Sequence, residues 1–255
     1  LSGGEPFMRP DWLPICERLV ALGLEPIMVS NLTFAGEEHY AELTRLGVEW
    51  VATSVDGPPS IHDRIRRTRG EAWSPFARTH ASIRELKARG LSVAVITHVS
   101  LWNLAHLDAL AGILEDLGVD QWQLKIGQPS GRLREVASSY LIYPRQIEDI
   151  YAFVRRVQRS GRLAIDVADD IGFFGPDEVE VRSLHGQPRF FAGCQAGFRS
   201  LSIASDGAVG GCPSLEITVG NIRETPLAEI WADESRFWFN HLDQSKIEGN
   251  CRRCS

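Results

Sequence analysis

The chain has 255 residues, of which 44% are apolar and 24% charged, a composition typical of globular proteins and not of disordered ones. Its 27 Lys and Arg against 33 Asp and Glu give a net charge of −6, which disfavours a nucleic-acid backbone as the main partner. No apolar run approaches the roughly 18 residues of a membrane span, and no secretion signal is recognisable. We therefore expect a cytoplasmic protein without nucleic-acid or membrane partners.

Helices and strands alternate along most of the chain, as predicted from apolar spacing. The first helix follows Asp11, and its apolar pattern assigns Cys16 to the core. A later helix has Ser74 as N-cap and Pro75 at its first position, where both residues are favoured. In chain order, the predicted elements are helix 12–22, strand 26–30, helix 37–46, strand 49–55, helix 75–89, strand 91–99, helix 104–117, strand 121–126 and helix 147–157.

This alternation predicts βαβ units and hence a parallel sheet or barrel. In such folds ligands bind at the carboxyl ends of the strands, so functional residues are expected in the loops that follow them. Asn31 and Thr33 end one predicted strand, and Ser54 and Asp56 end the next, where they could meet sugar hydroxyls. Each of these residues is also common in ordinary turns.

Near the start of the chain, Gly3-Gly4-Glu5-Pro6 leads into a helix. Two glycines let the backbone approach a ligand closely, and a carboxylate can accept hydrogen bonds from an ammonium group. As a short string this motif could equally be a simple turn. The polar strand ends that follow it strengthen its interpretation as part of a ligand site.

Four of the five cysteines lie near the end of the chain, where we expect them to bind a metal. Disulfides are rare in reducing compartments, so grouped cysteines are first interpreted as metal ligands. Cys251 and Cys254 form a C-x-x-C pair, and the turn signal Asp206-Gly207 brings Cys194 and Cys212 to the ends of a predicted hairpin. From spacing alone, the centre could be iron–sulfur or zinc.

Several of these runs resemble the sequences of radical S-adenosylmethionine (SAM) enzymes. Gly3 to Pro6 resembles their Gly-Gly-Glu-Pro loop. The run Val55 to Pro58, followed by Ile61 to Asp63 and by Arg69-Gly70, is similar to the next strand–helix units of that family. Gln128 to Arg132 resembles its Pro-x-Gly-Arg loop.

The C-terminal part resembles the SPASM or twitch extension, which houses auxiliary iron–sulfur clusters in the same family. In that extension a cysteine precedes a hairpin, a glycine lies five positions before the next cysteine, and a C-x-x-C pair follows a helix. Here Cys194 precedes the predicted hairpin, Gly207 lies five positions before Cys212, and Cys251 with Cys254 supplies the pair.

The resemblance implies an α/β fold with a partial (β/α)6 parallel barrel of radical SAM type over residues 1–185. A small C-terminal iron–sulfur extension, a β-hairpin plus a helix, would occupy residues 186–255. The cofactors implied are SAM and 4Fe–4S clusters. The glycine loop would hold the methionine ammonium, and the polar strand ends would hold the ribose. The residues implied are Gly3, Gly4, Glu5, Pro6, Asn31, Ser54 and Asp56 for SAM, and Cys194, Cys212, Cys251 and Cys254 for an auxiliary cluster.

The function implied is that of an oxidoreductase or maturase that generates a 5'-deoxyadenosyl radical and abstracts a substrate hydrogen. Peptide (RiPP-type) maturation and the biosynthesis of a cofactor or small molecule are the processes expected. The partners implied are a peptide or small-molecule substrate and an external electron donor of flavodoxin or ferredoxin type. In a longer SPASM domain the four cysteines would serve two clusters instead of one. No residue is assigned a catalytic role.

In these enzymes a C-x-x-x-C-x-x-C loop that holds the catalytic cluster precedes the Gly-Gly-Glu-Pro loop. The sequence begins at Leu1, just before the Gly-Gly-Glu-Pro loop and after the position that the cysteine loop would occupy. We therefore expect it to be a fragment whose catalytic-cluster ligands lie outside it. Such a fragment is expected to be inactive by itself.

Two other interpretations stay open. The same four thiolates could make a structural zinc site in a non-catalytic α/β binding or scaffold module, or the barrel could have lost its catalytic cluster. Among the remaining polar residues, His98 is assigned to packing at a strand end, and His62-Asp63 to stabilising a loop.

Overall fold

The computed structural model describes residues 1–66, 72–129, 133–168, 171–172, 175–191, 193–240, 249 and 252. The chain divides into two compact units, Leu1–Phe191 and Ala192–Ser255, whereas the sequence placed the boundary between residues 185 and 186. Within the described ranges, no helix is long and apolar enough to cross a membrane.

A five-stranded parallel sheet forms the centre of the first unit, with the strands side by side in chain order. Leu1 adds a further position beside β1: its amino group donates to the carbonyl of Ile27 at 2.6 Å, and its carbonyl accepts from the Val29 N–H at 2.8 Å. This is the hydrogen-bond pattern of parallel neighbours. The strands are β1 (Met28–Val29), β2 (Trp50–Ser54), β3 (Ser92–Val99), β4 (Gln121–Ile126) and β5 (Ile165–Val167).

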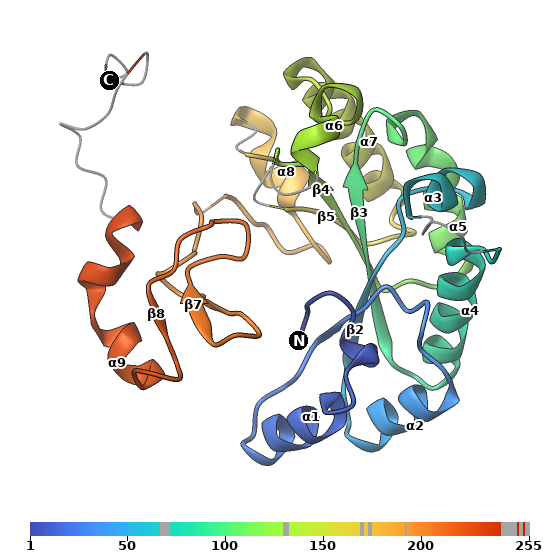
Figure 1. Cartoon of the computed structure of the whole chain (residues 1–255). Coiled ribbons are helices and arrows are strands. Elements are labelled where there is room, and N and C mark those ends of the chain that lie inside the picture. The colour runs from blue at the N-terminus through green and yellow to red at the C-terminus, as the bar shows by residue number, and fades with distance from the viewer. Residues whose placement is uncertain are drawn as a thin grey trace. The chain divides into compact units, whose positions relative to one another are not determined.

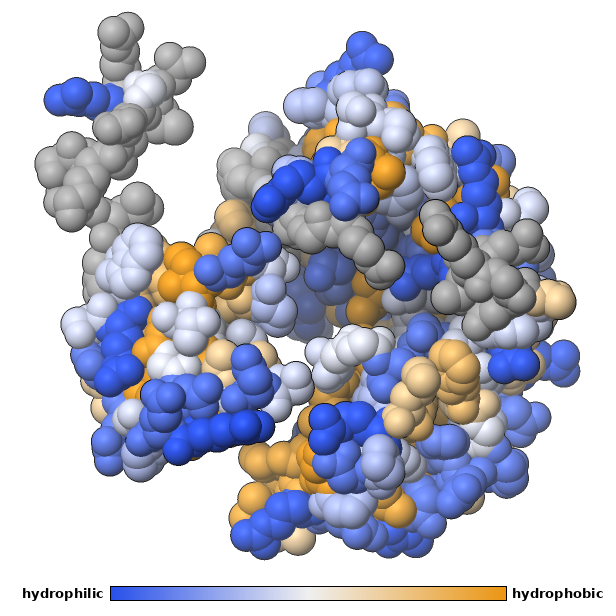
Figure 2. Space-filling model, viewed as in Figure 1, coloured by the Kyte–Doolittle hydropathy of each residue, from blue (hydrophilic) through white to orange (hydrophobic). Residues whose placement is uncertain are grey.

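Helices cover the outer side of this sheet, as Figure 1 shows for α1, α2, α4 and α5. Their apolar residues, such as Ile83 and Leu110, pack with the strand residues in one core. Figure 2 shows an apolar area over α1 at the lower end of this unit. Leu22 and Leu24, which follow α1 in the chain, are exposed. The helices are α1 (Trp12–Ala21), α2 (Glu37–Arg45), α3 (Pro59–Arg66), α4 (Pro75–Ala88), α5 (Leu107–Asp116), α6 (Leu133–Tyr140), α7 (Ile147–Ser160) and α8 (Glu178–Arg182).

The other face of the sheet is not covered by these helices. Along β3, buried residues alternate with half-buried ones, and the buried set belongs to the core beneath the helices. The half-buried set therefore points to the opposite side, which we call the inner face. The register of the parallel strands places Ser54, Ile96, His98, Gln123, Lys125 and Asp166 on this face.

Most of the predicted elements are present, with bounds that differ by a few residues. The α/β architecture is confirmed, and the predicted strand 121–126 coincides with β4. The predicted N-cap of α4 is also present, because the Ser74 hydroxyl accepts a hydrogen bond from the Ala77 N–H at 3.0 Å. Helices α3, α6 and α8 and strand β5 were not predicted.

The second unit contains a small antiparallel sheet in the order β6-β7-β8, followed by helix α9. The predicted turn between β6 and β7 is present, with Gly207 at φ +89° and the Ala208 N–H bonded to the Asp206 carboxylate. Ile230 of α9 is fully buried against the sheet. The elements are β6 (Ser202–Ile203), β7 (Ala208–Gly210), β8 (Gly220–Asn221) and α9 (Leu227–Ala232).

Candidate functional site

The Glu5 carboxylate joins the glycine loop to the carboxyl end of β1. One of its oxygens accepts hydrogen bonds from the Ser30 hydroxyl at 2.6 Å and the Phe7 N–H at 3.3 Å, and the other accepts from the Asn31 N–H at 2.9 Å. Pro6 begins the short 3-10 helix that follows. Glu5 is thus fixed at the rim of the sheet, which is where a ligand-binding loop is expected.

The backbone beside Glu5 is open. Gly3 and Gly4 are exposed, and a Cβ added to either glycine would meet no atom within 4 Å. A ligand can therefore approach the main chain at both positions. Glu5 and Asn31, two of the residues that the sequence singled out, meet here directly.

Asn31 and Ser54 end neighbouring strands. The Asn31 side-chain oxygen accepts from both the backbone N–H and the hydroxyl of Thr33, so this end of the amide is used to shape the loop. Ser54 is half-buried on the inner face, and among the described residues its hydroxyl has no hydrogen-bond partner. The Ser54 hydroxyl and the NH2 group of Asn31, which also has no partner among the described residues, can therefore both meet a ligand.

Asp56 has a different environment from Ser54, because it is buried. One carboxylate oxygen accepts from the Arg66 Nε at 2.5 Å and the other from the His98 N–H at 3.0 Å. The Asn103 amide donates to the main-chain carbonyls of both Asp56 and His98, each at 2.8 Å. The Asp56 side chain thus links the end of β2 to the end of β3, and its predicted contact with a ribose stays a prediction.

The His62-Asp63 pair stabilises a loop, as the sequence suggested. Nδ1 of His62 accepts from the Asp56 N–H at 3.1 Å, and the Asp63 carboxylate accepts from the Phe76 N–H at 2.8 Å. Burial lowers the pKa of His62 to about 4, so the ring is neutral and keeps Nδ1 free to accept.

His98 lies half-buried at the carboxyl end of β3, not fully in the core. Its Nδ1 is 3.3 Å from the Tyr140 hydroxyl, and the two rings stack with centroids 5.5 Å apart. Burial lowers the pKa of His98; the Asp56 charge opposes this shift, and the Arg66 and Lys125 charges add to it. The imidazole is therefore a neutral polar group at the inner face.

Three polar residues of the inner face were missed in the sequence: Gln123, Lys125 and Asp166. They occupy neighbouring positions on β4 and β5, where Gln123 is paired with Asp166 in the ladder. A signal for two of them was present, because polar Gln123 and Lys125 alternate with buried Trp122 and Leu124. Parallel strands are usually buried on both faces, so strict alternation indicates an uncovered face.

The structure describes two of the four C-terminal cysteines. Cys194 is exposed and Cys212 is half-buried, both as free thiols, whereas Cys251 and Cys254 lie outside the described residues. The sulfur of Cys212 accepts a hydrogen bond from the Ser214 N–H at 3.4 Å. Backbone donors to sulfur tune the potential of iron–sulfur clusters, so the environment of Cys212 is compatible with this role. Within the described residues, no cluster of three or more metal-ligating side chains forms.

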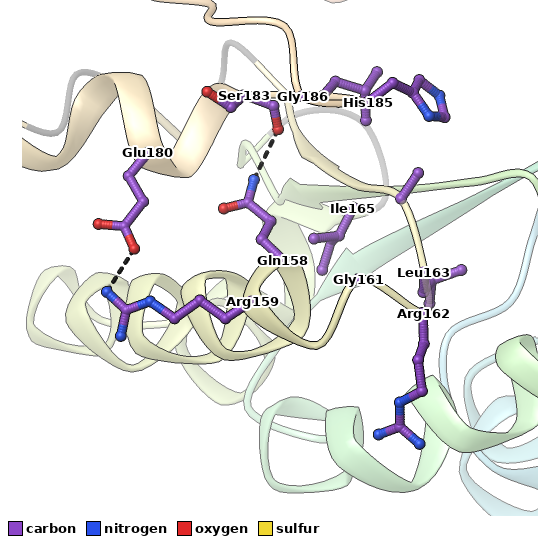
Figure 3. Close-up of a pocket in the computed structure, with 12 residues that line it drawn as sticks. Gln158, Arg159, Gly161, Arg162, Leu163, Ile165, Glu180, Ser183, His185 and Gly186 are labelled. Atoms are coloured by element: carbon purple, nitrogen blue, oxygen red, sulfur yellow. Dashed lines mark hydrogen bonds and ion pairs between the residues drawn. The ribbon is translucent and has the colours of Figure 1, made fainter.

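A cavity of about 510 Å³ lies at the other end of β5, between α7 and α8. Figure 3 shows Arg159 pointing to Glu180, with which it pairs at 2.6 Å, and the Gln158 amide pointing to Ser183, whose carbonyl accepts at 2.9 Å. The cavity borders the amino end of β5, and no site residue predicted from the sequence is among its described lining. We therefore assign it to the packing of the two helices.

Sequence profiles of two families match the chain. The profile of the radical SAM superfamily matches residues 1–112, and that of SPASM, an iron–sulfur cluster-binding domain, matches residues 194–255. The chain belongs to the radical SAM superfamily. The predicted family and its C-terminal extension are thereby confirmed, and an iron–sulfur site is favoured over zinc.

Named relatives of this radical SAM protein include enzymes of two kinds. The AdoMet-dependent heme synthase of Methanosarcina barkeri is 29% identical over 100% of this chain and 73% of its own length. The PqqA peptide cyclase of Ruegeria pomeroyi is 26% identical over 100% of this chain and 65% of its own length. The chain thus spans about two thirds of these relatives.

A solved structure with the same fold is SuiB of Streptococcus suis, with a TM-score of 0.69 at 14% identity. The match covers 92% of this chain and 55% of SuiB, so the chain spans about half of that protein. At this identity the likeness shows the fold alone. SuiB has also been solved with bound S-adenosylmethionine and with its precursor peptide SuiA.

The family implies SAM and 4Fe–4S clusters as cofactors, and the described residues are compatible with both. Polar groups suited to a nucleoside with an amino-acid tail come from the open backbone at Gly3 and Gly4, the fixed Glu5 carboxylate and the Ser54 hydroxyl, which has no partner in the described part of the chain. The thiol of Cys212, with its backbone donor, suits an auxiliary cluster.

Proposed function

We propose that this radical SAM protein is an oxidoreductase or maturase that abstracts a hydrogen atom from a peptide or a cofactor precursor. The observation that supports this proposal most directly is the Glu5 carboxylate, which three hydrogen bonds hold at the rim beside an open glycine backbone. SAM and a reduced 4Fe–4S cluster supply a 5'-deoxyadenosyl radical in this chemistry.

The chain's own residues bind and orient the SAM molecule. Gly3 and Gly4 offer main-chain groups, and Glu5 offers a carboxylate, to the methionine ammonium. The Ser54 hydroxyl binds the ribose, with Asn31 at the neighbouring strand end. Asp56 is placed by its contacts to hold the ends of β2 and β3 together, so we assign it the positioning of this rim rather than a direct ribose contact.

The second unit provides the auxiliary cluster site. Cys194 and Cys212 are two of its ligands, and the C-x-x-C pair at Cys251 and Cys254 completes the set. An external electron donor of flavodoxin or ferredoxin type serves the clusters, and we place the protein in the cytoplasm. Relatives named as heme synthases and as PqqA peptide cyclases support substrates of both kinds, a cofactor precursor and a peptide.

SAM binding tests the first unit. The Ser54→Ala variant should bind SAM about tenfold more weakly in calorimetric titration, because one hydrogen bond to the ligand is worth about 1 kcal/mol or somewhat more. Ser92→Ala is the matched control, since Ser92 lies at the opposite end of the same face, at the start of β3. A chain that does not bind SAM, or equal losses in both variants, would overturn the assignment.

Iron content tests the second unit. After anaerobic reconstitution with iron and sulfide, the protein should be brown, with broad absorbance at about 400 nm that Cys212→Ala diminishes. Cys16→Ala is the control, because Cys16 is fully buried in the core of the other unit. A colourless protein that retains a single zinc would contradict the proposal.

A further inference from the structure

The inner face carries polar residues that no step above uses. We call His98, Gln123, Lys125 and Asp166 the polar strip. The ladder pairs His98 of β3 with Lys125 of β4, and Gln123 of β4 with Asp166 of β5, so the four residues occupy two adjacent rows. Asn31 and Ser54 lie at the ends of β1 and β2, and Glu5 is hydrogen-bonded to the end of β1, so the strip occupies the other half of the sheet.

Lys125 is the cation of the strip. It is exposed, and among the described residues no carboxylate lies within ion-pair distance of its ammonium group. Lys87, by contrast, is paired with Asp120 at 2.5 Å. The residue beside Lys125 in the ladder is the neutral His98, which does not neutralise it. An ammonium group left without a counterion on a ligand-facing surface is suited to bind a carboxylate.

Asp166 is the anion of the strip. One of its oxygens accepts from the Val167 N–H at 2.8 Å, and the other from the Gln123 amide at 3.3 Å, but within the described residues it has no ion-pair partner. Burial raises the pKa of Asp166, whereas its hydrogen bonds and the charges of Arg189 and Arg182 lower it. A half-buried carboxylate with a long hydrogen bond can still accept from a ligand N–H group.

The two charges are spaced for a small polar ligand. Lys125 lies two residues beyond Gln123 on β4, and Asp166 lies next to Gln123 on β5, so the Cα atoms of the two charged residues are roughly 8 Å apart. An iron-bound tetrapyrrole could bring a propionate to Lys125, but its ring nitrogens carry no N–H group, so it would cover Asp166 without giving it a hydrogen bond, which is unfavourable. A peptide segment offers both a side-chain carboxylate and backbone N–H groups.

We propose that the polar strip is a substrate subsite for a peptide, in which Lys125 binds the carboxylate of an acidic residue while Gln123 and Asp166 bind its backbone amides. This inference rests on the proposed function and names the substrate class for it. It makes Lys125 a specificity-determining residue and leaves the SAM contacts at the other half of the sheet unchanged.

The test compares two synthetic peptides, acetyl-Ala-Glu-Ala-amide and acetyl-Ala-Gln-Ala-amide, bound to the full chain and followed by ligand-observed NMR. The wild type should bind the Glu peptide about tenfold more tightly than the Gln peptide, as expected for one charge-assisted contact. Lys125→Met should abolish this preference, and Lys125→Arg should keep it. Asp166→Asn should weaken both peptides equally. Lys87→Met removes the same charge elsewhere and should change nothing.

The proposal is overturned if the wild type binds neither peptide, binds both equally, or keeps its preference in Lys125→Met. It is also overturned if Lys125→Met weakens SAM binding instead of peptide binding. A parallel titration with Fe-coproporphyrin III, followed by its visible absorbance, examines the other substrate class. Binding of this tetrapyrrole that depends on Lys125, without binding of the Glu peptide, would refute the peptide assignment. SAM binding and iron content, measured on the same samples, separate these results from a failure of the proposed function.

Discussion

Replacing Asp56 with Asn should destabilise the first unit strongly, although the change removes no atom from the core. The carboxylate has 1% of its surface exposed and accepts from the Arg66 Nε and the His98 N–H. An Asn side chain keeps one acceptor oxygen, which can still bind the His98 N–H. Its NH2 group would then face the Arg66 Nε, so two donors would oppose each other.

The magnitude follows from the burial of the two partners. Breaking a fully buried ion pair costs about 3–5 kcal/mol. The Arg66 side chain is 36% exposed, so water compensates part of the loss on that side. We therefore expect the free energy of unfolding to fall by about 2 kcal/mol for Asp56→Asn. For Asp56→Ala, which leaves the His98 N–H unpaired as well, the expected loss is about 3 kcal/mol.

Urea denaturation followed by circular dichroism measures this change, with the two units fitted as separate transitions. The control is Asp108→Asn, which also breaks an ion pair with an arginine, Arg156, but at an exposed position. It should cost no more than about 0.5 kcal/mol. If Asp56→Asn were as stable as Asp108→Asn, the assignment of Asp56 to holding β2 and β3 together would be wrong.

Two further predictions concern pH and backbone conformation. The pKa of His62 is lowered to about 4 in the folded protein, against about 6.5 when unfolded, so the unfolded state takes up the proton first. His62 should contribute full stability above pH 6.5 and lose up to about 3 kcal/mol towards pH 4. His62→Gln should therefore reduce the slope of the urea midpoints with pH and leave the part due to His98, whose pKa is also lowered, and an unchanged slope would refute the cause. In the second unit, Gly197 has φ +76°, and an added Cβ would lie 2.5 Å from the Asn240 amide, whereas Gly193 has φ +85° and open space. Gly193→Ala should therefore lower the free energy of unfolding, measured by thermal unfolding, by about 1 kcal/mol, and Gly197→Ala should lower it by at least about 3 kcal/mol. Equal losses would show that the positive φ alone sets the cost and that the clash of the added Cβ contributes nothing.

The regular part of the fold could be predicted because its elements carry strong local signals. Strands β2, β3 and β4 are apolar or alternating runs, and α4 begins with the cap residues Ser74 and Pro75. Helix α3 gives no such signal, because it is rich in charge and buries only His62. Strand β5 has three residues and is too short to show a period.

The candidate site could be predicted only as far as the positions of residues relative to strand ends. That rule placed Asn31, Ser54 and Asp56 at or just after the ends of strands, and they lie there in β1 and β2, while their contacts with a ligand stay a prediction. It could not tell that both oxygens of the Asp56 carboxylate accept from protein donors, because Arg66 and the His98 N–H come from other segments. Nor could it tell that the Ser54 hydroxyl has no partner among the residues that the structure describes. Hydrogen bonds between residues distant in sequence leave no local signal.

The link between β2 and β3 connects the two proposed binding sites. Asp56 accepts from the main chain of His98, and Asn103 donates to the carbonyls of both residues, so the strand ends cannot move apart without breaking several bonds. Ser54 lies on one side of this link, and Lys125, paired with His98, on the other. Both sites are therefore preorganised by the same contacts. We expect Asp56→Asn to weaken SAM and peptide binding together, whereas Ser54→Ala affects SAM alone and Lys125→Met affects the peptide alone. If Asp56→Asn weakened SAM binding and left peptide binding unchanged, Asp56 would be acting as a direct SAM ligand, and the shared link would play no part in substrate binding.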